Sequence, residues 1–142
     1  MNADTLARTT LFSVPTSVES WTLGPSSTVL LASDVQLLYR HSTLAHYAIA
    51  TTTTVATPVP LADGALLRWV GFAPVGSKVA YVQDNNVYVA DATAPATAPT
   101  QVTTDGSDDI LNGIPDWSYE EEVLSTGEAV WWNSAGTSLA YL

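Results

Sequence analysis

The apolar positions of this 142-residue chain are gathered in short runs that alternate with clusters of turn-forming residues. The runs are rich in β-branched and aromatic residues, as in "STVLLAS", "VQLLYR", "HYAIATTTTV", "SKVAYVQ" and "NVYVA". The segments "GPSS", "APVGS", "QDNN" and "DGSDD" carry the Gly, Pro, Asn and Asp residues that are typical of turns. This pattern predicts an all-β fold of short strands, with a tight hairpin at "QDNN" in which Asn85 and Asn86 adopt positive φ.

Three segments resemble one another and indicate a structural repeat. They are "WTLGPSSTVLLAS", "VGFAPVGSKVAYVQ" and "VWWNSAGTSLAYL", and each runs from apolar residues through a small-residue turn into a second apolar strand. Leu23 and Phe72 are 49 residues apart, whereas Phe72 and Trp132 are 60 residues apart. A period of about 50 residues with several short strands is typical of β-propeller blades, which stack side by side because one blade cannot cover both of its faces.

The repeat also predicts how the chain is organised. The second interval is the longer one and contains an acidic run, so we expect that run on an insertion and not on a blade strand. The chain holds about two and a half repeats and ends at "LAYL" in the middle of one, whereas a closed propeller takes roughly four to eight blades. We therefore expect further blades outside this chain.

Composition and charge exclude several classes of function. With 14 acidic and 4 basic residues the net charge is −10, which disfavours nucleic acid and anionic membrane surfaces as partners. The absence of cysteine removes disulfides and thiolate chemistry. No apolar stretch approaches the roughly 20 residues of a membrane span. No metal is expected, since "DGSDDILNG" has Ile110 where a calcium loop requires glycine, and nothing indicates a cofactor.

The segment "DWSYEEEVL", Asp116 to Leu124, places three consecutive carboxylates behind a Trp and a Tyr. In one interpretation Asp116 or Ser118 caps a short helix, and the carboxylates of its first turn each gain about 0.3–1 kcal/mol from the helix dipole. The residues alone favour this interpretation. In the other, the helix faces a cavity and two adjacent carboxylates accept N–H donors from the primary ammonium group of a ligand.

Longer stretches around this motif are similar to a known family. The segment "NGIPDWSYEEEVL", followed by "AVWWNSAGTSLAYL" and preceded far upstream by "LLYRHSTLAHYAIA", resembles the dipeptidyl peptidase IV family of serine exopeptidases, which includes fibroblast activation protein. The likeness covers roughly residues 20–142. Two departures are structural: Ser118 replaces an apolar residue, and the turn from Trp132 to Gly136 lacks the family's proline.

The resemblance implies both a fold and a site. The fold is an eight-bladed propeller that caps an α/β-hydrolase domain, of which residues 20–142 would supply about two to three blades and a short inserted acidic helix, after a lead-in segment at residues 1–19. By matched position, Glu121 and Glu122 would bind the free α-amino group of a peptide substrate, and Arg40 would contact a substrate backbone carbonyl. The family releases N-terminal dipeptides with Pro or Ala in second position.

No catalytic residue is expected within this chain. The nearest string to a nucleophile elbow is Gly136-Thr137-Ser138-Leu139-Ala140, which lies in a repeat strand, and neither His41 nor His46 looks like a triad base. The reaction would need the hydrolase domain and the remaining blades as partners, and the family commonly forms homodimers. Relatives are plasma-membrane or extracellular proteins whose anchor would precede Met1.

Two alternatives stay open beside the peptidase. The chain could belong to a non-catalytic family member that serves as an accessory subunit of a membrane protein, because some relatives keep the glutamate helix without the nucleophile. It could also be a generic propeller interaction module in which the acidic run is simply solvated. In that case, the glutamates at 121 and 122 would hold no amine.

Overall fold

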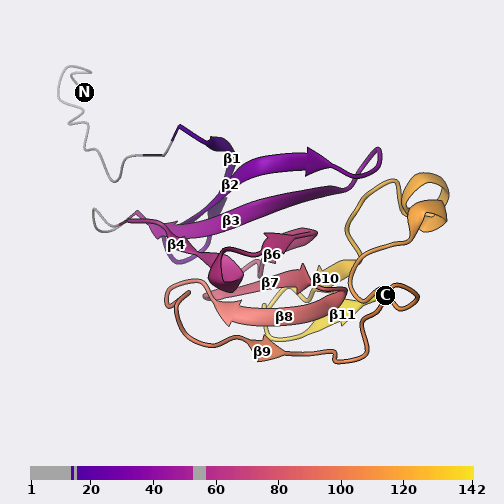
Figure 1. Ribbon diagram of the computed structural model, residues 1–142. Coiled ribbons are helices and arrows are strands. Elements are labelled where there is room, and N and C mark those ends of the chain that lie inside the picture. Colours follow the sequence, from indigo (N-terminus) through magenta and orange to yellow (C-terminus); the bar gives the residue numbers. More distant parts are fainter. Residues whose placement is uncertain (1–13, 15, 53–56) are drawn as a thin grey trace, which may run out of the picture.

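The computed structural model describes residue 14 and residues 16–52 and 57–142, and within them the chain forms three antiparallel sheets in sequence order (Figure 1). The first sheet has the order β1-β2-β3-β4, and β5 also pairs with β3. Its strands are β1 (Val18–Gly24), β2 (Thr28–Leu37), β3 (Thr43–Thr51), β4 (Val59–Pro60) and β5 (Leu66–Leu67).

The second and third sheets follow the same plan. The second has the order β6-β7-β8-β9, and the third consists of β10 paired with β11. Their strands are β6 (Trp69–Phe72), β7 (Lys78–Gln83), β8 (Asn86–Asp91), β9 (Thr100–Gln101), β10 (Val130–Trp132) and β11 (Leu139–Tyr141). Two short helical turns complete the described chain, η2 (Leu61–Gly64) and η3 (Tyr119–Leu124). Among these residues no helix is long and apolar enough to cross a bilayer.

Each of the three similar sequence segments forms the first hairpin of a sheet, which confirms the repeat. In the second sheet Phe72 pairs with Val79, and in the third Trp132 pairs with Leu139. The loops between these pairs have equal length, and each contains a glycine with positive φ. The acidic run lies between β9 and β10, on an insertion as predicted.

The hairpin predicted at "QDNN" is present, but its turn is shifted by one residue. Positive φ occurs at Asp84 (49°) and Asn85 (58°), whereas Asn86 is the first residue of β8 and pairs with Gln83. A two-residue hairpin loop needs positive φ at both central positions, and Asp tolerates this conformation nearly as well as Asn. The prediction for Asn86 was therefore wrong, because the strand register and not the residue type selects the turn residues.

The strand β7 is buried on both faces, which shows how the sheets stack. Val79 and Tyr81 belong to a cluster shared with the first sheet, where Leu30, Ile49 and Leu67 face them. Ala80 and Val82 belong to a second cluster together with Val87, Ile114 and Val130. Because side chains alternate across a strand, the second sheet is packed between the first and the third, as a propeller blade is between its neighbours.

The turns at one end of the sheets also touch. The Ser26 hydroxyl donates to the Gly76 carbonyl at 2.8 Å, which links the first turns of sheets one and two. A Cβ added to Gly136 would lie 2.5 Å from the Val75 carbonyl oxygen, so the corresponding turn of sheet three lies against that of sheet two. The three repeats therefore stack in the same orientation, as consecutive blades do.

Candidate functional site

The acidic helix begins at Asp116, not at Ser118. The Asp116 carboxylate accepts the Tyr119 N–H at 2.8 Å, and its carbonyl accepts the Glu120 N–H at 2.8 Å, whereas the Ser118 side chain makes no capping hydrogen bond. Residues 119–124 then form a π-helical turn that ends at Ser125, which has a φ of 54°. Turns of this kind are rare and occur frequently at functional sites.

The three consecutive glutamates of this turn have three different environments. Glu120 is fully buried, with 0% of its surface exposed. The Glu121 side chain is 8% exposed. Glu122 is exposed to solvent, and within the described part of the chain no hydrogen bond or ion pair holds its carboxylate. The capping by Asp116 agrees with the first interpretation of the run, whereas a simple solvated acidic face would expose all three carboxylates and here only Glu122 is exposed.

Arg40 and Glu121 are in contact although they are 81 positions apart in the sequence. Arg40 lies in the loop between β2 and β3, and its Nη1 atom is 2.9 Å from Oε2 of Glu121. The Arg40 backbone N–H also donates to Oε1 of Glu121, at 3.3 Å. The structure therefore brings together two of the three residues predicted for the site, and the third, Glu122, follows Glu121 on the same turn.

Glu120 is hydrogen-bonded to the same loop, at His41, the residue that follows Arg40. Its Oε1 atom accepts the His41 N–H at 2.8 Å, while its buried Oε2 atom has no hydrogen-bond partner in the described structure. The loop itself is closed by the Leu38 N–H, which donates to the Ser42 carbonyl at 2.9 Å. Two adjacent glutamates of the helix therefore hold two adjacent N–H groups of the loop.

Arg68 is a basic residue of this region that the sequence reasoning missed. It lies between β5 and β6, and its Nη1 atom donates to Oδ1 of Asn85 at 3.4 Å. Burial lowers the pKa of Arg68 from its usual value, and the charges of Tyr39 and Glu120 act in the opposite direction. The segment "LLRWV" could have pointed to Arg68, because an arginine within an apolar run is expected to be partly buried. Such an arginine is seldom buried without a partner.

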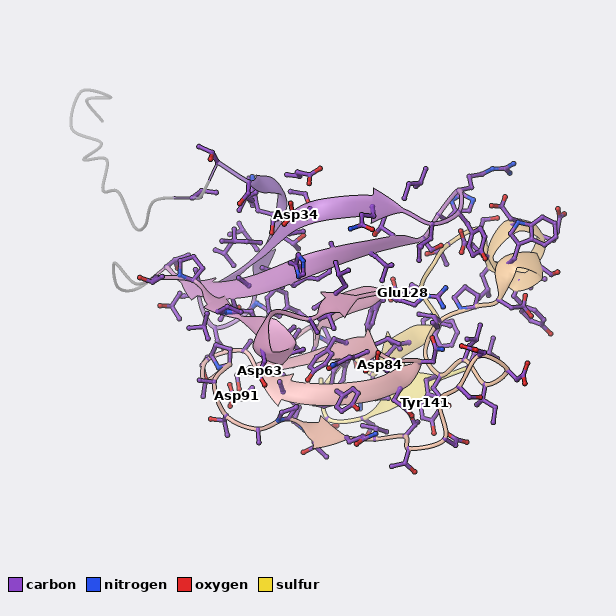
Figure 2. All side chains as sticks on the ribbon, in the orientation of Figure 1. Asp34, Asp63, Asp84, Asp91, Glu128 and Tyr141 are labelled. Carbon is purple, nitrogen blue, oxygen red and sulfur yellow. The ribbon has the colours of Figure 1, made fainter. Side chains whose placement is uncertain are left out.

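The region lies at one edge of the molecule, where the β2–β3 hairpin points toward the acidic helix (Figures 1 and 2). His41 is exposed, and His46 bonds through Nδ1 to the Gly64 carbonyl at 2.8 Å. Ser138 lies in the turn before β11, where its N–H donates to Asn133, and not in a strand as predicted. In the described ranges no three metal-ligating side chains lie close enough to hold an ion.

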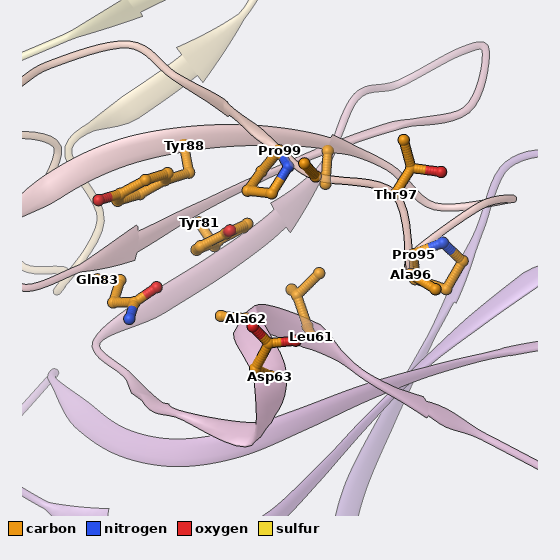
Figure 3. Close-up of a pocket in the computed structure, with 12 residues that line it drawn as sticks. Leu61, Ala62, Asp63, Tyr81, Gln83, Tyr88, Pro95, Ala96, Thr97 and Pro99 are labelled. Carbon is orange, nitrogen blue, oxygen red and sulfur yellow. The ribbon is translucent and has the colours of Figure 1, made fainter.

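A groove of about 320 Å³ opens elsewhere, between η2, the strands β7 and β8, and the loop at residues 95–99 (Figure 3). Tyr81 and Tyr88 stack on its floor with centroids 5.2 Å apart, and Asp63 lies at its rim. Burial raises the pKa of Tyr81 to about 12, so its hydroxyl stays neutral at physiological pH. The groove has one carboxylate and no nucleophile–base pair, so the acidic helix is the better candidate site.

Comparison with known proteins gives a consistent result. Residues 25–142 match the family model described as the dipeptidyl peptidase IV (DPP IV) N-terminal region. The chain is 40% identical over 135 residues to the "Probable dipeptidyl-aminopeptidase B" of Tuber melanosporum, covering 89% of this chain and 15% of that protein. It is 39% identical over 147 residues to the "Prolyl endopeptidase FAP" of Bos taurus, covering 96% of this chain and 18% of that protein.

A solved structure supports the fold. The crystal structure of Porphyromonas gingivalis dipeptidyl peptidase 4 superimposes with a TM-score of 0.75 at 29% identity, covering 86% of this chain and 17% of that chain. The prediction of an all-β, partial β-propeller with a short acidic helix is confirmed. The chain spans 15% to 18% of the length of these relatives, so it corresponds to a small part of each.

Proposed function

Because this chain belongs to the dipeptidyl peptidase IV family, in its N-terminal propeller region, we propose that it binds the free N-terminus of a peptide substrate. Glu121 and Glu122 accept N–H donors from the substrate's α-ammonium group, and Arg40 donates to the first backbone carbonyl. The observation that carries the proposal is the Arg40–Glu121 pair, in which the Arg40 Nη1 atom lies 2.9 Å from a carboxylate whose neighbour on the same turn is exposed.

The charges of the region fit a cationic ligand. Acidic side chains outnumber basic ones here, since Arg40 and Arg68 lie among the three glutamates of the helix and Asp116, which leaves a net negative region for a cationic ligand. A charge-assisted hydrogen bond contributes about 1.5–3 kcal/mol, roughly twice a neutral one. The arrangement therefore favours a cationic terminus over an acetylated one.

For the whole protein we propose hydrolysis that releases N-terminal dipeptides with Pro or Ala in second position. The two glutamates hold the substrate's amino group and block further entry, so that only two residues lie between that group and the bond that is cut. The chemistry is assigned to the family's serine-type hydrolase domain, with the remaining blades as further partners. We propose no metal or cofactor for the site in this chain. We also propose a homodimer at the plasma membrane or outside the cell.

The test is a titration of the ¹⁵N-labelled chain with alanyl-prolinamide, followed by NMR. We expect shifts of the Arg40, Glu121 and Glu122 amide signals, and no shifts with the N-acetylated peptide. The double variant Glu121→Gln/Glu122→Gln should weaken binding by about 10- to 100-fold, since two hydrogen bonds to the ammonium group lose their charge assistance.

The matched control is Asp63→Asn, which removes one negative charge at the groove of Figure 3, away from the acidic helix in Figure 2. Asp63 has a φ of 52°, a conformation that Asn also tolerates. A loss of binding free energy in the control about half that of the double variant, in proportion to the charges removed, would mean that general charge attraction, and not an amine site, holds the peptide. Equal binding of the free and acetylated peptides would contradict the proposed function.

A further inference from the structure

We propose that Glu120 is a positioning residue which, with Arg68 as its counter-charge, holds the Arg40–His41 loop against the acidic helix and so fixes the Arg40–Glu121 pair. The inference deepens the proposed function and rests on it where it concerns amine binding. The geometry that it explains is independent of that function, because it is the packing of the β2–β3 loop against the helix.

The burial of Glu120 has no explanation within its own helix. The helix is already capped by Asp116, and the next two residues are also glutamates but are less buried. A carboxylate with 0% exposure is costly unless it is hydrogen-bonded and paired with a positive charge. The described structure supplies one hydrogen bond, from the His41 N–H at 2.8 Å, so a counter-charge is the remaining requirement.

Arg68 supplies that charge from the segment between β5 and β6. Its backbone N–H donates to the Val82 carbonyl at 3.2 Å, which fixes the residue beside β7, and its buried Nε atom has no hydrogen-bond partner in the described structure. A cavity of about 140 Å³ is lined both by Arg68 and by His41 and Ser42 of the loop. Arg68 and the loop therefore line the same cavity. Burial lowers the pKa of Arg68 and the charge of Glu120 acts in the opposite direction, so Arg68 lies close enough for its charge to act on this carboxylate.

The Arg40 side chain depends on this anchoring. It is 73% exposed, and an exposed arginine loses side-chain entropy when it is held in one geometry. Glu121 and Glu120 accept the consecutive N–H groups of Arg40 and His41, at 3.3 Å and 2.8 Å. These two adjacent hydrogen bonds from backbone N–H groups fix both the position and the direction of the loop. The backbone of Arg40 is therefore held next to Glu121, which limits where its side chain can go.

The experiment compares Glu120→Gln, Glu120→Ala and Arg68→Gln in the ¹⁵N-labelled chain. Gln at position 120 keeps an acceptor for the His41 N–H but removes the charge, whereas Ala removes both. One readout is the Arg40 Nε–H signal, whose chemical shift and solvent exchange report whether the guanidinium is held by Glu121. The second readout is the dissociation constant for alanyl-prolinamide.

We expect Glu120→Ala to shift the Arg40 Nε–H signal to that of a freely exchanging guanidinium group and to raise the dissociation constant about tenfold. The two Gln variants should raise the dissociation constant about threefold. These values correspond to the loss of one hydrogen bond or of one charge. The matched control is Ile49→Val in the core between sheets one and two, where the residue is 2% exposed. It should lower the melting temperature without changing either readout. A purely structural role for Glu120 would give the same result as this control, and would overturn the proposal.

The two proposals can fail separately. If the wild-type chain binds no free amine, the proposed function fails. The positioning role of Glu120 is then tested by the Arg40 Nε–H signal alone. An unchanged Arg40 signal in Arg68→Gln, which alters a half-buried side chain and is expected to fold, overturns the positioning role even if Glu120→Ala does not fold.

Discussion

The blade turns and the acidic helix relate sequence to structure in opposite ways. The turns after Phe72 and after Trp132 have different residues but the same geometry: Ala73 N–H donates to the Lys78 carbonyl and Asn133 N–H to the Ser138 carbonyl, both at 2.9 Å. In the helix, three identical residues have three environments, from fully buried to exposed. The turns are determined by nearby residues, whereas the glutamates are distinguished by residues that are distant in the chain.

The missing proline in the third turn illustrates the local case. Asn133 stands at the start of that turn, and its Oδ1 atom accepts the N–H groups of Thr137 at 2.9 Å and Ser138 at 3.1 Å. A side chain that bonds the backbone in this way closes the turn without help from elsewhere. The departure from the family pattern is therefore compensated within six residues.

The largest effect on stability is expected from substitutions in the blade cores. We expect the cores to contribute much more to the free energy of unfolding than the acidic helix does. Leu67→Ala removes a side chain with 0% exposure and should lower the free energy of unfolding by about 2–5 kcal/mol. Val123→Ala on the acidic helix, where the residue is 63% exposed, should cost less than about 0.5 kcal/mol. Urea unfolding followed by circular dichroism measures both. Similar losses would show that the helix contributes as much stability as a blade.

An intermediate effect on stability is expected at the glycines of the blade turns. Comparing two of them separates the cost of local turn geometry from the cost of contact between blades. Gly76 and Gly136 occupy the same place in their turns, with φ of 83° and 64°. Alanine at either position adopts a left-handed conformation that costs about 1–2 kcal/mol. At Gly136 the new Cβ also meets the Val75 carbonyl at 2.5 Å, whereas at Gly76 it meets nothing within 4 Å.

We therefore expect Gly136→Ala to be the more destabilising of the two, and the difference in melting temperature measures the contact between sheets two and three. Equal losses would mean that the two turns move apart freely, which would contradict the tight stacking of consecutive blades.

The smallest effect on stability is expected at the ion pair. Arg40→Met keeps much of the side-chain volume but removes the charge, and because Arg40 is 73% exposed the cost should be about 1 kcal/mol or less. The difference from the wild type should shrink as salt is raised from 0.05 to about 1 M, since the Debye length falls to about 3 Å. A salt-independent loss, measured by thermal unfolding, would show that Arg40 stabilises the loop by packing alone.

Much of the fold could be predicted from the sequence, because strands, turns and the blade repeat are encoded by residues close together in the chain. The unbroken run of apolar residues in "KVAYVQ" already implies two buried faces, and the 60-residue interval already implies an insertion. The error at Asn86 has the same origin, since residue preference alone does not distinguish Asp84-Asn85 from Asn85-Asn86 as the turn pair. The strand register makes that choice.

For the site, the sequence by itself determined which side chains are present: the glutamates of one helical turn, and an arginine in the β2–β3 loop. Only the tertiary structure decided that Glu120 is buried, that Glu121 is paired with Arg40 and that Glu122 is exposed. The physical reason is that the charge of a carboxylate is set by its own chemistry, whereas its desolvation and its partners depend on groups that folding brings within a few ångströms. The sequence therefore shows that Arg68 is present, but not that the charge of Glu120 acts on it.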